Sequence, residues 1–144
     1  MPISAALAND DIMLNIKPGE HGSTFGGNPL AASVALASLQ VLVDEKLADN
    51  AEKQGQYFRK RLKETQKKTN IISEVRGKGL LNAIVIEPTR DGKTAWDFCL
   101  QLLTNGLLAK PTHGNIIRFA PPLVIKDEQM ETCCDVIERT ILEF

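Results

Sequence analysis

The sequence lacks a dominant charge, and this absence weighs against two classes of partner. Its 144 residues carry 17 lysines and arginines against 18 acidic residues, for a net charge of −1. Binding to nucleic acid or to an anionic membrane surface relies on an excess of positive charge. No apolar run reaches the roughly 18 residues of a membrane-spanning helix, and residues 1–11 lack the basic leader of a signal peptide. We therefore expect no nucleic-acid partner and no membrane partner.

Cysteine and histidine are also scarce. The cysteines, Cys99, Cys133 and Cys134, are odd in number and two are adjacent, which favours reduced thiols in an intracellular protein. We expect the adjacent pair to pack within a helix rather than to act as ligands or nucleophiles. The histidines, His21 and His113, each lie beside a glycine, and no second histidine stands at the spacing of a metal site. The sequence therefore predicts no metal.

The residues that are present indicate a folded domain with a core. Hydrophobic residues make up 43% of the chain and charged residues 24%, a balance typical of globular proteins. Residues 45–144 predict an α+β layer in which helices pack on a small, mostly antiparallel sheet. The expected elements are a helix over 47–66, strands within 71–87, a helix after Thr94, a hairpin about 113–115 and a helix from Asp127.

The helix expected over 47–66 has one narrow apolar stripe and otherwise basic faces. The stripe recurs at the helical period and consists of Leu47, Ala51, Gly55, Phe58 and Leu62. The basic residues are Lys53, Arg59, Lys60, Arg61, Lys63, Lys67 and Lys68. They could form a polyanion site or a solvated surface. Interspersed acids and the absence of interleaved aromatic residues favour the solvated surface.

Two further segments of this region have apolar patterns. Residues 79–86 are apolar on both faces apart from Asn82, which predicts a central strand covered on both sides. Thr94 and Asp97 have the spacing of a capping box at the start of a helix. We expect the core-facing stripe of that helix to consist of Trp96, Cys99, Leu100 and Leu103.

Residues 1–44 do not form a closed unit by themselves. Residues 3–8 predict a short buried strand. Residues 30–43 predict a helix that is apolar nearly all round, hence buried, and Pro29 suits its first turn. No other part of this segment can cover such a helix, and the chain starts directly in an apolar stretch. We therefore expect further chain to precede it.

The glycine-rich loop HGSTFGGNP, residues 21–29, lies between these elements. Glycines let a backbone approach a ligand, and successive N–H groups with hydroxyls make a concavity for anions. A helix follows, and helix N-termini favour anions. The loop could be a phosphate cup, or a structural turn in which Ser23 and Thr24 cap backbone groups. It is not a P-loop, because no lysine follows Gly27.

Three segments resemble a known family. They are GEHGSTFGGNPLA at 19–31, VRGKGLLNAIVI at 75–86 and NGLLAKPTHGNIIRFAPPLVI at 105–125. In one collinear register they resemble the pyridoxal-phosphate-dependent aminotransferases of class III and fold type I, in the ornithine and acetylornithine group. The run LAKPTHGNIIRFAPPL points to the ornithine branch, whereas STFGGNPLAA is compatible with the acetylornithine branch as well.

The resemblance implies a cofactor and a second subunit. In this family the HGST loop binds the phosphate of pyridoxal 5'-phosphate held by the neighbouring subunit of a homodimer. Carried over, Thr24 binds the phosphate through its hydroxyl and backbone N–H, Ser23 lies beside it, and Gly22 lets the loop approach. A phosphate dianion favours several neutral donors held in a preorganised nest.

The resemblance also gives Arg118 a role, as the arginine that binds a substrate carboxylate. A guanidinium fork holds a carboxylate bidentately, which lysine cannot do. An arginine within an apolar strand is expensive to bury unless it is paired. The alternative is a structural ion pair with one of the chain's own acids. The turn Arg76–Lys78 with Gly79 matches a conformationally special turn of the family. We expect it to be mainly structural, and the lesser alternative is that Arg76 helps to position the dimer or the substrate.

One essential residue of the reaction is missing. Transamination needs a Schiff-base lysine, and Lys17, Lys78 and Lys110 do not match its position. We therefore expect a C-terminal fragment in which residues 1–44 end the large cofactor-binding domain and residues 45–144 form the small domain. The full enzyme would transfer the δ-amino group of ornithine to 2-oxoglutarate in the mitochondrial matrix or the cytoplasm. The alternatives are an acetylornithine-type enzyme, or a non-catalytic module for folding and dimerisation.

Overall fold

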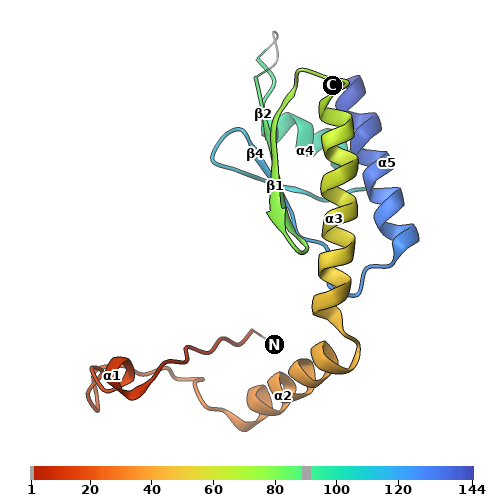
Figure 1. Cartoon of the computed structure of the whole chain (residues 1–144). Helices are drawn as coiled ribbons and strands as arrows, with labels where there is room; N and C mark the ends of the chain where they lie inside the picture. The colour runs from red at the N-terminus through yellow and green to blue at the C-terminus, as the bar shows by residue number, and fades with distance from the viewer. Residues whose placement is uncertain (1, 89–91) are drawn as a thin grey trace. The chain divides into compact units, whose positions relative to one another are not determined.

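The computed structural model describes residues 2–88 and 92–144, which separate into two compact units (Figure 1). Contacts divide the chain into Met1–Glu45 and Lys46–Phe144. Within the described residues, no helix is long and apolar enough to cross a membrane.

The unit Lys46–Phe144 is built on a four-stranded, fully antiparallel sheet in the order β1-β2-β4-β3. This agrees with the predicted α+β layer of helices on a small antiparallel sheet. Its strands are β1 (Ile72–Lys78), β2 (Leu81–Ile86), β3 (Lys110–Thr112) and β4 (Ile116–Phe119). Its helices are α3 (Leu47–Gln66), α4 (Ala95–Thr104) and α5 (Asp127–Glu143).

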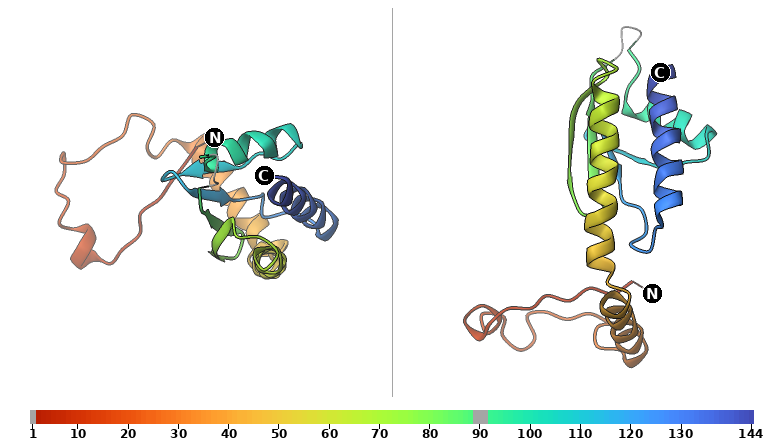
Figure 2. Two further views of the ribbon diagram at one scale, coloured as in Figure 1. Left: turned by 90° about the horizontal axis from the view of Figure 1, so that it is seen from above. Right: turned by 45° about the vertical axis from the view of Figure 1, so that its right-hand side comes forward.

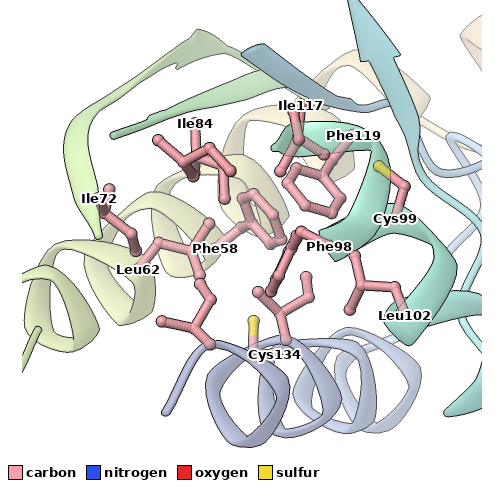
Figure 3. Close-up of a cluster of buried hydrophobic side chains, with 14 of the residues drawn as sticks. Phe58, Leu62, Ile72, Ile84, Phe98, Cys99, Leu102, Ile117, Phe119 and Cys134 are labelled. Atoms are coloured by element: carbon pink, nitrogen blue, oxygen red, sulfur yellow. The ribbon is translucent and has the colours of Figure 1, made fainter. Parts of the chain in front are cut away.

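The apolar stripe of α3 lies in the core, as the helical period predicts. All its members are buried, and Leu62 is completely enclosed. Figure 3 shows side chains from α3, the sheet, α4 and α5 meeting in one cluster. Phe58 of α3 contacts Phe119 of β4 with ring centroids 5.4 Å apart. The helices therefore share one core with one face of the sheet.

The opposite face of the sheet is open, which corrects one expectation. In β2, Asn82, Ile84 and Ile86 are buried, whereas the alternate residues are exposed or half-buried. The prediction of a central strand is confirmed, because β2 pairs with both β1 and β4. The prediction that both its faces are covered is wrong for this chain, since the helices lie on one face only.

Helix α4 begins as predicted but buries a different stripe. The N–H and the hydroxyl of Thr94 both donate to Asp97 Oδ2 at 2.8 Å. The buried residues are Ala95, Phe98, Cys99 and Leu102. Of the predicted stripe only Cys99 is buried, and Trp96 is 60% exposed. Because α4 is apolar on most sides, its periodicity admits more than one inward face, and the true one is rotated by about one residue.

Helices α3 and α5 run parallel and side by side (Figure 2), linked by ion pairs along their length. Lys53 contacts Asp127 at 2.7 Å, and Arg61 contacts Asp135 at 2.7 Å. Lys68, just after the end of α3, contacts Glu138 at 2.6 Å. Part of the basic run of α3 is therefore matched by acids of α5. This agrees with a solvated structural surface rather than a polyanion site.

The unit Met1–Glu45 contains two helices and no strand among residues 2–45. Helix α1 is Asp10–Met13 and helix α2 is Pro29–Asp44, with Pro29 in its first turn as predicted. The strand expected over 3–8 is not formed, because no second strand of this unit offers backbone partners. Ala31 is the only buried residue of α2, so its own unit leaves the apolar faces of this helix uncovered, as expected for a segment that cannot close on itself.

Candidate functional site

The phosphate-loop candidate, residues 21–28, is an irregular exposed segment between α1 and α2. A turn is closed by the N–H of Gly26, which donates to the carbonyl of Ser23 at 3.2 Å. Gly27 has a φ of +72°, a conformation that glycine adopts without strain. An added Cβ at Gly22 would meet nothing within 4 Å, so the backbone there is open to a ligand.

The hydroxyls of this loop are uncommitted in the part of the chain that the structure describes. Neither Ser23 nor Thr24 uses its hydroxyl in a hydrogen bond within residues 2–88 or 92–144. The alternative in which they cap backbone groups is therefore not what forms. Asn28 is the capping residue instead, because its Oδ1 accepts from the N–H of Ala31 at 2.8 Å.

The N-terminus of α2 is less available to an anion than the sequence suggests. Asn28 occupies the N–H of Ala31, and Pro29 has no N–H to offer. Any phosphate bound here would be held by the hydroxyls and backbone of the preceding turn. These hydroxyl and N–H donors are neutral, and the hydroxyls can rotate towards a ligand. They suit the phosphate of pyridoxal phosphate, and no carboxylate among them would repel its negative charge. The nearest acid in the sequence, Glu20, accepts from the N–H of Lys17 at 2.6 Å.

Arg118 lies in the middle of β4, on the open face of the sheet. Its neighbours Ile117 and Phe119 are buried, whereas Arg118 is exposed. The sequence places this arginine within an apolar strand, which would bury it. The structure corrects that premise: strand alternation turns the guanidinium away from the core.

Arg118 has no acidic partner among the described residues, so the structural ion pair considered for it is not formed within them. Its guanidinium makes no hydrogen bond there either. An exposed guanidinium fixed on a paired strand has its five donors available for an external carboxylate.

The hairpin of β3 and β4 places a second cation opposite Arg118. Lys110 is its register partner on β3, and both residues are exposed. The connecting turn contains His113 with a φ of 50° and Gly114 with a φ of 82°. The sequence predicts this hairpin but not the position of Lys110 beside Arg118. Lys110 and Arg118 each lie four residues from Gly114, and this symmetric spacing about the turn is the sequence signal for their pairing.

Helix α3 holds the turn between β1 and β2 through side-chain hydrogen bonds of Arg59, a contact that no pattern in the sequence indicates. The carbonyl of Gly79 accepts from Arg59 Nη1 at 3.0 Å, and the same nitrogen donates to Asn82 Oδ1 at 2.8 Å. An added Cβ on Gly55 would lie 1.8 Å from the carbonyl oxygen of Gly79. The turn is therefore locked in place, which fits the mainly structural role expected for it.

The cysteines form no nucleophilic site. All three are free, and Cys99 and Cys134 are buried in the core of Lys46–Phe144. Burial raises the pKa of Cys99 to about 11 and that of Cys134 to about 12, and it also raises the pKa of Cys133. The thiols stay protonated near neutral pH and act as small apolar groups, as expected for packing residues.

Comparison with known sequences identifies one family over nearly the whole chain. Residues 1–141 match the family described as aminotransferase class-III. The mitochondrial ornithine aminotransferase of Rattus norvegicus is 57% identical over 143 residues, which are 99% of this chain and 32% of that protein. The mitochondrial ornithine aminotransferase of Drosophila melanogaster is 60% identical over 141 residues, 98% of this chain and 32% of that protein. The chain thus spans about a third of the length of these relatives.

Solved structures of the same kind superpose on this chain. An ornithine delta-aminotransferase of Plasmodium falciparum superposes with a TM-score of 0.87 at 48% identity, over 95% of this chain and 35% of that chain. An acetylornithine aminotransferase from Elizabethkingia anophelis superposes with a TM-score of 0.86 at 63% identity, over 96% of this chain and 36% of that chain. The fold of the described residues is therefore one that such proteins share.

Proposed function

The chain belongs to the class III aminotransferases, and from this premise we propose that it is the C-terminal portion of a pyridoxal-phosphate-dependent ornithine aminotransferase. The complete enzyme would move the δ-amino group of ornithine to 2-oxoglutarate, giving glutamate semialdehyde and glutamate. The observation that supports this most is the identity of 57% and 60% with two animal ornithine aminotransferases over nearly every residue of the chain.

The proposal assigns the two units to two domains. Residues 1–44 would end the large cofactor-binding domain, and residues 45–144 would be the small C-terminal domain. The lysine that binds the cofactor covalently would lie outside this chain, so the chain alone would be inactive. The free thiols and the mitochondrial relatives support an intracellular location, in the mitochondrial matrix or the cytoplasm.

The exposed loop would hold the cofactor of the second subunit in a homodimer. Pyridoxal phosphate, when bound, supplies the electron sink for moving an amino group. The Thr24 hydroxyl and backbone N–H would donate to its phosphate, with Ser23 beside it. Gly22 would let the backbone approach, which the open space at its Cβ position supports. These neutral donors would orient the cofactor and take no part in proton transfer.

Arg118 would bind a substrate carboxylate. Its exposure and its lack of an acidic partner among the described residues support this role. The guanidinium fork would fix the α-carboxylate of 2-oxoglutarate or glutamate through two parallel hydrogen bonds. Orienting the acid in this way would select the oxo-acid half of the reaction rather than the ornithine half.

The test is Arg118→Ala in the complete polypeptide that contains this chain. The KM for 2-oxoglutarate should rise about a hundredfold or more, because a charge-assisted bidentate contact is lost. The thermal midpoint should stay within about 1 °C, since Arg118 packs against nothing in the core. Arg76→Ala, on the same sheet face, is the matched control. An unchanged KM in Arg118→Ala would contradict the assignment.

The acetylornithine alternative keeps one specific observation in its favour, the 63% identity to the Elizabethkingia anophelis enzyme. Comparing kcat/KM of the complete polypeptide on ornithine and on acetylornithine separates the two. A preference for acetylornithine would overturn the ornithine proposal and leave the role of Arg118 intact. For the chain alone, borohydride reduction with pyridoxal phosphate and peptide mass spectrometry should find no stoichiometrically labelled lysine.

A further inference from the structure

A row of residues crosses the open face of the sheet from edge to edge. The strand registers pair Arg76 with Ala83, Ala83 with Arg118, and Arg118 with Lys110. Directly opposed residues in antiparallel strands point to the same face. The face opposite the core thus presents Arg76 and Lys110 near its two edges, with Arg118 between them.

The cations of this row differ in whether an acidic side chain lies beside them. Arg76 Nη1 contacts Glu74 Oε2 at 3.2 Å, so its charge is locally matched. Within residues 2–88 and 92–144, neither Lys110 nor Arg118 has an acidic partner. Opposed side chains on adjacent strands have Cβ atoms about 4.5–5.5 Å apart, and like charges at that distance destabilise a sheet. The fold therefore places two cations at opposed positions of two paired strands, with no counter-charge among the described residues.

We propose that Lys110 is a second binding residue for the anionic substrate, acting on the same carboxylate as Arg118. This rests on the proposed function, in which Arg118 binds a 2-oxo dicarboxylic acid. The guanidinium fork fixes the plane of the carboxylate, and the ammonium adds a point charge from the neighbouring strand. Lys110 would strengthen binding of a dianion and contribute little to ornithine, whose net charge is positive.

The hairpin makes this pairing rigid. Pro111 follows Lys110 and restricts its backbone, and the turn at His113 and Gly114 fixes the register. Strands β3 and β4 continue to pair beyond Lys110, where Pro111 lies opposite Ile117 and Thr112 lies opposite Ile116. The two cations therefore cannot separate by a slip of one strand without moving the buried side chain of Ile117 out of the core.

The test compares Lys110→Gln, Lys110→Arg and Arg76→Gln in the complete polypeptide. Lys110→Gln should raise the KM for 2-oxoglutarate about tenfold and leave the ornithine half-reaction within about twofold. Lys110→Arg should restore most of the affinity because it keeps the charge. Arg76→Gln is the matched control on the same row and should change the KM less than about twofold, since Glu74 already balances that arginine.

Two readouts separate a binding role from a structural one. Calorimetric titration with glutarate, which has both carboxylates and no reactive carbonyl, should give a Kd about tenfold weaker in Lys110→Gln. The thermal midpoint of Lys110→Gln should be unchanged or slightly higher, because a like-charge pair is removed. A lowered midpoint with an unchanged glutarate Kd would overturn the inference in favour of a structural lysine.

The outcome also distinguishes this inference from the proposed function. If Arg118→Ala weakens glutarate binding and Lys110→Gln does not, the inference fails and the function stands. If neither variant affects glutarate, the carboxylate-binding role of this sheet face fails as a whole. If Arg76→Gln weakens binding as much as Lys110→Gln, the effect is general surface charge rather than a site, which also overturns the inference.

Discussion

Helices α2 and α3 are both long, but they use their apolar residues in opposite ways. Helix α3 has a single stripe, and the stripe is buried, with Leu62 fully enclosed. Helix α2 is richer in apolar residues, yet only Ala31 is buried and Leu36 is 69% exposed. Hydrophobic content therefore does not decide burial. What decides it is whether other elements of the same unit can cover the apolar faces.

The two units differ in whether they cover the apolar faces of their own long helix. Lys46–Phe144 covers the stripe of α3 with a sheet and two further helices. Among residues 2–45, α2 has only the four-residue helix α1 and irregular chain as neighbours in sequence. Large exposed apolar surfaces on a folded chain mark contacts with other protein surface. Covering α2 requires residues from outside Met1–Glu45.

The largest difference between the two helices is expected when the same substitution, leucine to alanine, is made in each. Leu62→Ala should lower the free energy of unfolding of the 144-residue chain by about 2–5 kcal/mol, because it leaves a cavity in the core. Leu36→Ala should change it by less than about 0.5 kcal/mol, because the side chain is already in solvent. Urea unfolding followed by the fluorescence of Trp96, the single tryptophan, measures both. Equal losses would show that α2 is packed in this chain.

The sequence predicts the fold well where a pattern has only one solution. The narrow stripe of α3, the capping box at Thr94 and the turn about Gly114 each specify one local structure, and each is found. Prediction fails where apolar residues lie on several sides. The inward face of α4 is rotated from the expected one. A strand over 3–8 fails for a related reason, because a strand needs a partner that local sequence does not supply.

The candidate site shows the same limit. The sequence and the family resemblance together are enough to propose Ser23, Thr24 and Arg118 as site residues. They are not enough to predict the surroundings of these residues, which depend on contacts between distant segments: the cap supplied by Asn28 and the pairing of Lys110 with Arg118 come from the folded chain. The contact of Gly55 with Gly79 joins residues 24 positions apart and leaves no local pattern.

That contact supports the second prediction, Gly55→Ala. Alanine should stabilise a helix interior by about 1 kcal/mol relative to glycine. Here the added Cβ would lie 1.8 Å from the carbonyl oxygen of Gly79, and a backbone oxygen cannot move aside as a flexible side chain could. We expect overpacking to prevail, with a net loss of about 1–3 kcal/mol in urea unfolding. A gain in stability would mean that α3 and the β1–β2 turn are not tightly packed.

Helix caps offer a third and smaller test, again one in each unit. Thr94→Ala should lower the unfolding free energy of Lys46–Phe144 by about 0.5–2 kcal/mol, because the start of α4 loses its hydrogen bond to Asp97. Asn28→Ala removes the cap of α2. Since α2 is not packed into a cooperative core, this change should lower helical circular dichroism slightly and leave the Trp96 transition in place. A shift of that transition in Asn28→Ala would show that the two units unfold together.

The smallest expected effect comes from the ion pairs of Glu138, a residue of α5, within Lys46–Phe144. Glu138 accepts from Lys68 at 2.6 Å and from Arg61 at 3.1 Å. These hydrogen bonds, that of Lys68 foremost, hold the pKa of Glu138 below its ordinary value of 4.5. A lowered pKa in the folded state means that folding favours the ionised carboxylate. The stabilisation is therefore complete above pH 4.5 and is lost as the pH falls through the folded-state pKa.

Glu138→Gln isolates this contribution, with Glu131→Gln as the matched control on the same helix. Glu131 is exposed and forms no ion pair within the described residues. At about pH 7, Glu138→Gln should cost less than about 1 kcal/mol, because the partners are partly solvated. As the pH falls from 7 through the folded-state pKa, which lies below 4.5, the difference between parent and variant should shrink towards zero, because the parent's carboxyl becomes protonated. Urea midpoints across this range measure it, and a gap that stays constant with pH would show that Glu138 acts through packing rather than through its charge.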